Sequence, residues 1–417
     1  MSSQTDLRRR TRSRDDRRHH HSPVGFLDHA LADYFLLLGV IFALLTLGLV
    51  MVFSASSVEA LADTGSSVSQ FQKQALIAIV AVPFMFWLSR QPASFFYRIA
   101  PAALIVALIL LVLVLIPGIG VNVGGQQNWI PLPGGMSLQP SEIGKMALIL
   151  WCARILTIKA DRLDDWKEVT LPLLPVAGLV IVLVLLEGDL GTALVFMPIV
   201  AMMLFISGVP TRLFVMLGAL GLSLIAFMAL TEGYRMQRFM VFLNPEMDAN
   251  GAGWQTIHGR MALATGGWWG VGLGASREKW GSLPEAHNDF ILAIIGEELG
   301  LLGTLAVVAL FTLMGLVSIR IARRTSSIFV RLTIMGIVAW ILTQAVINMG
   351  AVVGLLPVTG VPLPLVSYGG SSLMMVLTAM GVLLAFARSE PAAAALIRHR
   401  RAERRRRRRR PRTPTAA

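Results

Sequence analysis

The sequence predicts an all-α integral membrane protein that crosses the bilayer about ten times. Hydrophobic residues make up 55% of the 417 residues and charged residues only 15%, whereas an ordinary globular domain carries about 25% charged residues. The mean hydropathy is +0.68, and the apolar residues are gathered in runs. This composition excludes a soluble enzyme. Because an unpaired backbone group in lipid costs several kcal/mol, each crossing is expected to be helical.

Ten apolar runs approach the length needed to cross about 30 Å of hydrocarbon. In order, they are Tyr34–Phe53, Gln74–Leu88, Ile99–Ile116, Ile143–Ile158, Leu171–Leu186, Leu190–Ile206, Leu213–Leu230, Phe290–Ile319, Phe329–Val353 and Ser371–Phe386. The apolar core of the first run is about 20 residues, longer than that of a cleaved signal peptide, so it is expected to remain as a helix. Only Glu187, Gly188 and Asp189 separate the fifth run from the sixth.

The basic residues predict that both ends of the chain lie in the cytoplasm. Residues 1–33 hold 7 Arg against 5 acidic residues, and residues 388–417 hold 12 Arg against 2. With this orientation the inner loops and the helix ends beside them carry eleven basic residues, whereas the short outer loops carry only Lys73, as the positive-inside rule requires. The expected parts are a basic disordered tail (1–33), a ten-helix membrane domain (34–388) and an Arg-rich disordered tail (389–417). Tails of this kind favour anionic lipid headgroups, and nucleic acid is not an expected partner.

Three long loops are then expected on the outer face of the membrane. They are Pro117–Gln139, the 58-residue segment Thr231–Asn288 between the seventh and eighth helices, and Gly354–Gly370. They are rich in Trp, Gly and Pro, which is not the composition of disorder, and long loops in compact proteins are usually functional. The absence of an internal repeat weakens the interpretation as an inverted-repeat transporter.

Metal and redox chemistry find little support in the residue types. Cys152 is the only cysteine, which excludes an intramolecular disulfide and a thiolate metal cage. Three of the seven histidines, His19 to His21, lie in the basic tail, and no His-Glu-x-x-His pattern occurs. The sequence therefore assigns no metal ligand.

Charged residues inside membrane segments are costly and are candidates for function. Glu142 and Lys145 lie three residues apart at the start of the fourth helix, so they can pair. The pair either neutralises itself and holds the bundle, or presents Lys145 as a cation to an anionic ligand. Asp189 begins the sixth helix, where it is either an N-terminal cap or a functional acid.

The densest polar signal is the run Leu283–Gly300, LPEAHNDFILAIIGEELG. Asp289 lies where a long polar loop meets an apolar helix, so partial desolvation would raise the pKa of its carboxyl and improve it as a general base. A helix cap is the alternative for this residue. Glu297 and Glu298 lie about two turns deeper, and His287 is expected to be a hydrogen-bonding neighbour of the base.

Two glycine-rich stretches complete the set. Gly266–Gly274, GGWWGVGLG, follows no predicted strand, so a tight loop is favoured over a dinucleotide site. Ser367–Ser372, SYGGSS, begins the tenth helix, where free N–H groups favour an anion such as a diphosphate.

With these residues assembled, the chain resembles the SEDS family (shape, elongation, division and sporulation), and its cell-division members more than its elongation members. The similarity covers roughly Tyr34 to Ser389. It rests on LQPSEIGK (Leu138–Lys145), GDLGTA (Gly188–Ala193), YRMQRFMVFLNP (Tyr234–Pro245), LPEAHNDF (Leu283–Phe290), GEELG (Gly296–Gly300) and LPVTGVPLPLVSYGGSS (Leu356–Ser372).

This resemblance implies a ten-helix peptidoglycan glycosyltransferase that polymerises lipid II at the outer face of the cytoplasmic membrane. Its implied partners are a class B penicillin-binding transpeptidase and other division proteins. The family's proposed catalytic acid falls on Asp289. The residues expected to contact the substrate are Glu142, Lys145, Asp189, Arg260, Lys279, Ser367, Gly369 and Gly370.

One position departs from the family pattern. The family usually has Arg before the Trp that precedes the QPSE motif, whereas Asn128 precedes Trp129 here. The missing charge is expected to come from basic residues of the long outer segment, namely Arg235, Arg238, Arg260, Arg277 or Lys279.

The implied chemistry agrees with the residues. Displacing a lipid diphosphate from a sugar needs one base for the attacking hydroxyl, whereas hydrolysing a glycoside also needs a second carboxyl to protonate the departing oxygen. Cations would stabilise the charge on the diphosphate, a task that a divalent cation could share; no cofactor is otherwise expected. The competing hypotheses are an elongation polymerase, a flippase for a polyprenyl-linked sugar and a noncatalytic scaffold.

Overall fold

Nine helices of the structure correspond to nine of the ten expected membrane helices. The computed structural model describes residues 31–389, apart from 134–135, 163–165, 217, 220, 222, 224–240, 250, 252 and 281–282. The nine helices are α2 (Ala32–Thr64), α3 (Ser69–Leu88), α4 (Ala93–Val114), α5 (Pro140–Ile158), α6 (Trp166–Leu186), α7 (Leu190–Ile206), α11 (Ile291–Arg324), α12 (Ile328–Val352) and α13 (Gly370–Ser389). The remaining expected helix, Leu213–Leu230, lies largely outside the described residues, as do the two tails.

The described helices have the length and surface of a multi-pass membrane protein. Six of them, α2, α3, α4, α11, α12 and α13, are long and apolar enough to cross a membrane, and α6 and α7 contain shorter apolar stretches. Apolar side chains also cover the outside of the bundle, where Ile79 is 67% exposed and Ile105 is 58% exposed. Exposed apolar surface of this extent is expected against lipid rather than water.

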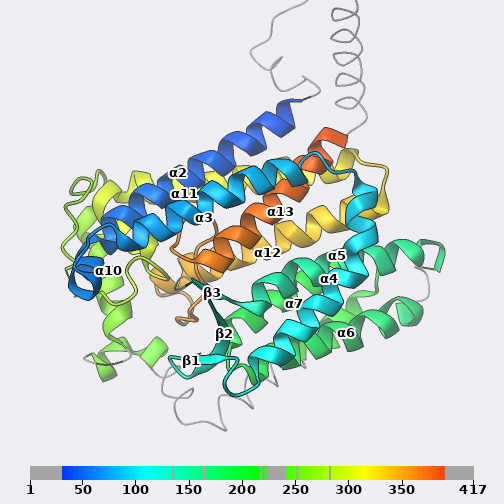
Figure 1. Cartoon of the computed structure of the whole chain (residues 1–417), viewed down its shortest axis with the longest axis horizontal. Coiled ribbons are helices and arrows are strands. Elements are labelled where there is room, and N and C mark those ends of the chain that lie inside the picture. Colours follow the sequence, from blue (N-terminus) through cyan, green and yellow to red (C-terminus); the bar gives the residue numbers. More distant parts are fainter. Residues whose placement is uncertain are drawn as a thin grey trace, which may run out of the picture.

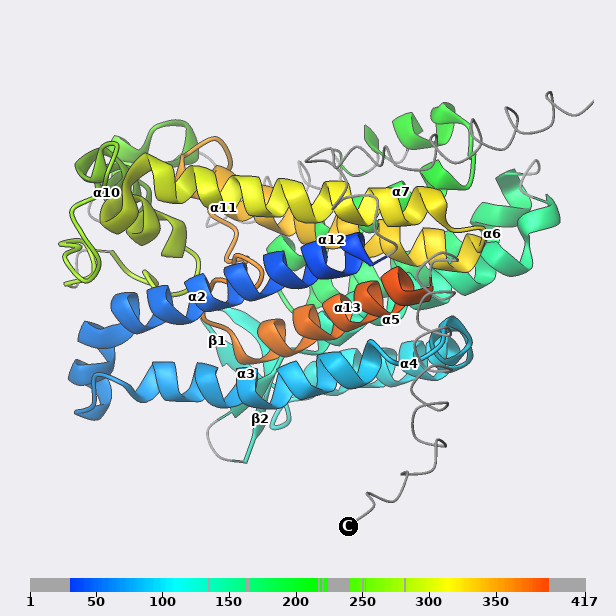
Figure 2. The same ribbon diagram turned by 90° about the horizontal axis from the view of Figure 1, so that it is seen from above.

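The bundle places α12 at its centre. In both views α2, α3, α11, α12 and α13 run side by side (Figures 1 and 2), and α12 packs against α5, α7 and α11. The largest fully buried side chains include Trp340 of α12, Phe196 of α7 and Lys145 of α5. A lysine among the most buried residues requires polar partners, because an uncompensated charge in such a place is costly.

The structure corrects the expected loops in two places. Pro117–Gln139, expected as a loop, contains a three-stranded antiparallel sheet in the order β1-β2-β3, formed by β1 (Val121–Val123), β2 (Gln126–Leu132) and β3 (Met136–Leu138). The strands are too short to give a clear alternating pattern, which is why the sequence did not predict them. The segment Thr231–Asn288 contains a further helix, α10 (Trp254–Gly266).

Helix ends differ as well. α2 continues to Thr64, and α11 to Arg324, both beyond their apolar runs. Hydrophobicity indicates where a helix leaves the membrane but not where its hydrogen bonding ends. The length of a helix that extends beyond the apolar layer is therefore underestimated.

The three segments expected on the outer face meet at one end of the bundle, which we call the loop end. The Gln139 N–H donates to Oγ of Ser371 (3.1 Å), and the Tyr368 N–H donates to the His287 carbonyl (2.9 Å). The α10 helix lies at the same end (Figure 1), where the Arg260 guanidinium donates to the Gly354 carbonyl (3.3 Å). Segments far apart in the sequence therefore share one site.

Candidate active site

Asp289 lies at the loop end, in the turn that leads into α11. The residue that caps α11 is Phe290, and no side chain caps this helix terminus. Among the described residues, none donates a hydrogen bond to the Asp289 carboxylate. A Cβ at Gly360 would lie 3.6 Å from its Oδ2 atom, so the main chain of the segment before α13 runs past the carboxylate. The interpretation of Asp289 as a helix cap is therefore wrong, and its carboxylate remains available to a ligand.

The surroundings of Asp289 favour its protonated form. Burial raises the pKa of the carboxyl to about 7, with smaller contributions in the same direction from the negative charges of Glu285 and Asp189 and an opposing one from His287. A carboxyl with a pKa near the working pH can both accept and release a proton. The expected desolvation of this residue is thus present in the structure.

The main chain around Asp289 is held by side chains of other elements. The side-chain amide of Asn348 on α12 donates to the Asp289 carbonyl (2.8 Å) and to the Val361 carbonyl (2.9 Å). The Ser367 hydroxyl donates to the Asn288 carbonyl (2.7 Å) and accepts from the Leu363 N–H (2.8 Å). These contacts join the turn before α11 to the segment before α13. Asn348 could not be identified as part of this site from the sequence pattern.

The glycine-rich start of α13 is already engaged by α3. The side-chain amide of Gln74 donates to the Ser367 carbonyl and its oxygen accepts from the Gly369 N–H, both at 3.2 Å. Gly370 is the first residue of α13. The structure thus brings Ser367, Gly369 and Gly370 next to the Asp289 turn, although the Gly369 N–H has an internal partner in place of an anion.

Lys145 and Glu142 form the expected pair, deep inside the bundle. Their charged atoms lie 2.8 Å apart, and the two side chains are 1% and 2% exposed. The Lys145 ammonium also donates to Oε1 of Gln344 (3.1 Å) and lies 4.9 Å from the centre of the Trp340 ring. With these partners on α12, the pair has the geometry of a contact that holds α5 against α12.

Gln344 and Asn348 extend this contact towards Asp289. They lie four residues apart on α12 and so share one face of the helix. The side-chain amide of Gln344 donates to the Pro362 carbonyl (2.9 Å), one residue after the Val361 carbonyl that Asn348 contacts. A continuous line of polar contacts therefore runs from Lys145 to the main chain of Asp289.

Asp189 caps the N-terminus of α7. Its Oδ1 atom accepts from the Thr192 N–H (2.8 Å), and its Oδ2 atom accepts from the Thr192 hydroxyl (2.8 Å). Its Oδ2 atom also accepts from the side-chain amides of Gln139 (3.0 Å) and Asn128 (3.1 Å). The structural interpretation of Asp189 as a cap is confirmed. Asn128, which replaces the family's usual Arg, thus meets this acid with a neutral donor, so the negative charge of Asp189 is not balanced at this position.

Glu187 is a buried acid that the sequence pattern did not single out. Its side chain is only 1% exposed, and among the described residues neither carboxylate oxygen has a hydrogen-bond partner. Burial, and to a smaller extent the charge of Asp189, raises the pKa of this carboxyl to about 8. Burial therefore favours the uncharged form of Glu187 at neutral pH.

The expected cations fall into two groups. Arg260 and Arg277 are exposed at the loop end, where an anionic ligand can reach them. Lys279 is buried and forms an ion pair with Glu298, at 3.1 Å, so its charge is already compensated. Arg235 and Arg238 lie outside the described residues.

The described residues form no preformed cluster of metal ligands. Within the described part of the chain, no group of three or more His, Cys, Asp or Glu side chains is placed to hold a metal ion.

Comparisons with known proteins show which proteins the chain is similar to. The sequence profile of the cell cycle proteins FtsW, RodA and SpoVE matches residues 35–391. The chain is 40% identical over 373 residues to the probable peptidoglycan glycosyltransferase FtsW of Mycobacterium tuberculosis, covering 89% of this chain and 71% of the relative. It is 38% identical over 353 residues to the stage V sporulation protein E of Bacillus subtilis, covering 85% and 96%.

Two solved structures share the fold. One, at 27% identity and a TM-score of 0.70, comes from a peptidoglycan synthase complex described as coordinating polymerization and crosslinking, and the match covers 85% of this chain and 97% of that one. The other is the rod shape determining protein RodA of Thermus thermophilus, at 26% identity and a TM-score of 0.63, with 85% and 96% covered.

Proposed function

Because the chain belongs to the FtsW/RodA/SpoVE family of cell cycle proteins, we propose that it is a peptidoglycan glycosyltransferase that polymerises lipid II during septal wall synthesis. The observation that carries the proposal is the Asp289 carboxyl, which caps no helix, has a pKa raised to about 7 and lies where three outer segments meet. The relatives named as probable FtsW glycosyltransferases favour the septal role over elongation.

In the proposed reaction Asp289 is the general base. It takes the proton from the attacking sugar hydroxyl as the new bond forms between that oxygen and C1 of the second sugar. The bond from C1 to the lipid diphosphate breaks, and the diphosphate leaves with its electron pair, already ionised. No second carboxyl is needed to protonate the leaving group, unlike in glycoside hydrolysis.

The exposed cations of the loop end complete this scheme. Arg260 and Arg277 are placed to approach the diphosphate, where positive charge stabilises the negative charge that develops as the bond breaks. Glu142, Lys145 and Asp189 support the site from inside the bundle, and Ser367, Gly369 and Gly370 shape the segment that faces Asp289. The exposure and the partners of each side chain support these assignments.

The proposed setting is the cytoplasmic membrane, with both termini in the cytoplasm and the loop end outside. The orientation follows from the distribution of Lys and Arg in the loops. A class B penicillin-binding transpeptidase is the proposed partner, since the similar structure comes from a complex that couples polymerization to crosslinking. Other division proteins would bring the enzyme to the septum.

The deciding experiment incubates the purified protein, with and without its transpeptidase, with labelled lipid II. Glycan ladders on a gel are the expected product. If no ladder forms and the protein instead moves the lipid between the leaflets of vesicles, the proposal fails in favour of a flippase. Copurification with elongation proteins rather than division proteins would overturn the septal assignment.

A further inference from the structure

The helix that follows Asp289 is broken after its first nine residues. Gly300, inside α11, has φ 68° and ψ −166°, a conformation outside the helical region that separates Ile291–Leu299 from the rest of the helix. Only glycine fits here, because a Cβ would lie 2.4 Å from the Gly270 nitrogen and 2.5 Å from the Trp268 carbonyl. The segment Ile291–Leu299 is therefore a short helix, about 14 Å long, with Asp289 just before it.

The glycine-rich segment Gly266–Gly274 fills the break. The carbonyls of Glu297 and Glu298 accept from the N–H groups of Val271 (2.9 Å) and Gly272 (3.1 Å), and the Leu301 N–H donates to the Gly267 carbonyl (2.8 Å). Backbone groups that lose their helical partners in a membrane protein must find other partners inside the protein. The expectation of a tight loop at Gly266–Gly274 is confirmed, and its purpose is to satisfy the broken helix.

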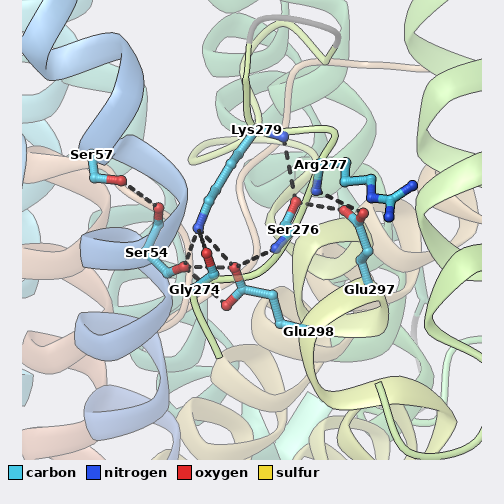
Figure 3. Close-up of polar contacts among 8 residues, drawn as sticks. All are labelled: Ser54, Ser57, Gly274, Ser276, Arg277, Lys279, Glu297 and Glu298. Atoms are coloured by element: carbon cyan, nitrogen blue, oxygen red, sulfur yellow. Dashed lines mark hydrogen bonds and ion pairs between the residues drawn. The ribbon is translucent and has the colours of Figure 1, made fainter. Parts of the chain in front are cut away.

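Side chains reinforce this junction (Figure 3). The Lys279 ammonium donates to Oε1 of Glu298 (3.1 Å), to the Gly274 carbonyl (2.7 Å) and to Oγ of Ser54 (3.2 Å). The Ser54 hydroxyl lies 2.7 and 2.9 Å from the two oxygens of Glu298. Ser54 belongs to α2, so the contact joins three separate parts of the chain.

The neighbouring acid is held by the same loop. Glu297 accepts from the Ser276 hydroxyl at Oε2 (2.5 Å) and from the Arg277 N–H at Oε1 (2.9 Å). Figure 3 shows both carboxylates turned towards the loop that carries Lys279. Both acids of the Glu-Glu pair are therefore used inside the protein, which leaves Asp289 as the acid of this region without an internal partner among the described residues.

The position of the Lys279–Glu298 ion pair relative to Asp289 suits it to hold the segment that carries Asp289. Lys279 precedes Asp289 by ten residues and Glu298 follows it by nine. The ion pair therefore joins the two ends of the segment 279–298, which has Asp289 near its middle. Lys279 and Glu298 are 5% and 0% exposed at the side chain. Such a pair is screened little by solvent, and its geometry fixes both ends of the loop at once.

We propose that Ser54, Lys279 and Glu298 form a latch that positions Asp289 relative to α2 for glycosyl transfer. They are positioning residues and do not touch the substrate. The proposal rests on the proposed function for its kinetic consequence, and it reassigns Lys279 from a cation that binds the diphosphate to a cation that holds the catalytic loop.

Kinetics separate the two roles of Lys279. The variants Ser54→Ala and Glu298→Gln are each expected to lower kcat for lipid II polymerisation roughly 10- to 100-fold, because a small misplacement of a reacting group costs this much. KM is expected to stay within about threefold, since substrate contacts are kept. Ser57→Ala is the matched control, because Ser57 lies one turn along α2 and bonds the Ser54 carbonyl instead of Glu298. It should retain the parent kcat.

The double variant Lys279→Met/Glu298→Gln removes the ion pair without leaving a buried charge. It is expected to fold but to keep the low kcat. A parent-like kcat in this variant would overturn the latch, because the pair would then be only a structural contact. A KM raised by Lys279→Met but not by Glu298→Gln would overturn it in favour of a substrate cation.

A readout without substrate distinguishes failure of the latch from failure of the proposed function. Hydrogen exchange of the amides of residues 283–290 in the full-length detergent-solubilised protein is expected to accelerate in Ser54→Ala and in the double variant, but not in Ser57→Ala. Unchanged exchange in both would overturn the latch whether or not the parent polymerises lipid II. A parent that makes no glycan, with the expected exchange pattern, would overturn only the proposed function.

Discussion

The side-chain amide of Asn348 donates a hydrogen bond of 2.8 Å to the main-chain carbonyl of Asp289. The same amide reaches the Val361 carbonyl at 2.9 Å, so one residue of α12 ties the turn before α11 to the segment before α13. Asn348 is buried, and no charge is involved. The main chain of the proposed base is thus held by Asn348 of α12. The far end of the helix Ile291–Leu299, which follows the base, is held through Glu298.

Replacing Asn348 tests the support from α12. Asn348→Ala leaves two carbonyls without their donor, and an unsatisfied buried polar group costs about 1–3 kcal/mol. We expect a lower thermal stability and slower polymerisation of lipid II. Val346→Ala is the control, since Val346 lies on the exposed side of α12. Unchanged activity in Asn348→Ala would mean that this contact does not hold the site.

Replacing Asp289 tests the base itself. Asp289→Asn keeps the size of the side chain, and a general base contributes roughly 10²- to 10⁴-fold in rate, so polymerisation should fall at least about 100-fold. Binding of the transpeptidase partner should survive. Because Asp289 caps no helix, no stability is lost through capping. A variant that polymerises lipid II within a few-fold of the parent would show that Asp289 is not the base; Glu297 would not replace it readily, because its carboxylate already accepts from Ser276 and Arg277.

The raised pKa of Asp289 also predicts a dependence of stability on pH. Its pKa is about 7 in the folded protein and about 3.9 in an unfolded chain, so the folded state binds the proton more tightly. The stability contributed by that proton is full below about pH 4 and is lost as pH rises through about 7. The thermal stability of Asp289→Asn relative to the parent should therefore increase as pH rises from about 4 to about 8. A constant difference across this range would contradict the raised pKa.

The negative charge of Asp189 predicts a shift in the pH profile of activity. Asp289 must be ionised to act as a base, so polymerisation should rise with pH through about 7. Asp189→Asn removes one of the charges that raise the pKa of Asp289, and the rising limb should move to lower pH. The amide can still accept a hydrogen bond from the Thr192 N–H as a cap, so folding should persist. If the rising part of the pH profile does not shift in Asp189→Asn, the charge of Asp189 does not influence the pKa of Asp289.

The pair of Glu142 and Lys145 inside the bundle offers a further test. Lys145→Met alone leaves the buried Glu142 uncompensated and should cost about 3–5 kcal/mol of stability. Adding Glu142→Gln should restore most of it, and because Lys145 contacts only internal partners in the described structure, activity should return as well. Restored stability without polymerisation would instead assign Lys145 to the substrate.

The orientation of the chain can be tested without any activity. Ala249→Cys lies in an exposed part of the long segment before α10, and Asp161→Cys lies in the exposed connection before α6. An impermeant thiol reagent should label the first from outside the cell and spare the second. The native Cys152 is buried and should stay unlabelled. Reversed labelling would place the site on the cytoplasmic side.

From the sequence alone we predicted the membrane class and nearly all of the membrane helices, and we chose Asp289 as the candidate base. These features follow from local composition, because a run of apolar residues in lipid has only the helix available to it. Asp289 was identified by its place between a polar loop and an apolar helix. The sequence also predicted that Glu142 and Lys145 pair, since three residues of helix bring their side chains together.

Contacts between distant segments determine which charged side chains have internal partners and which are exposed. Lys279 and Arg277 lie two residues apart in one basic stretch, yet the structure buries Lys279 against Glu298 and leaves Arg277 exposed. The role of Asn348 could not be predicted, because it depends on two carbonyls that other segments bring to its side-chain amide. Such contacts join residues tens or hundreds of positions apart, and local pattern carries no information about them.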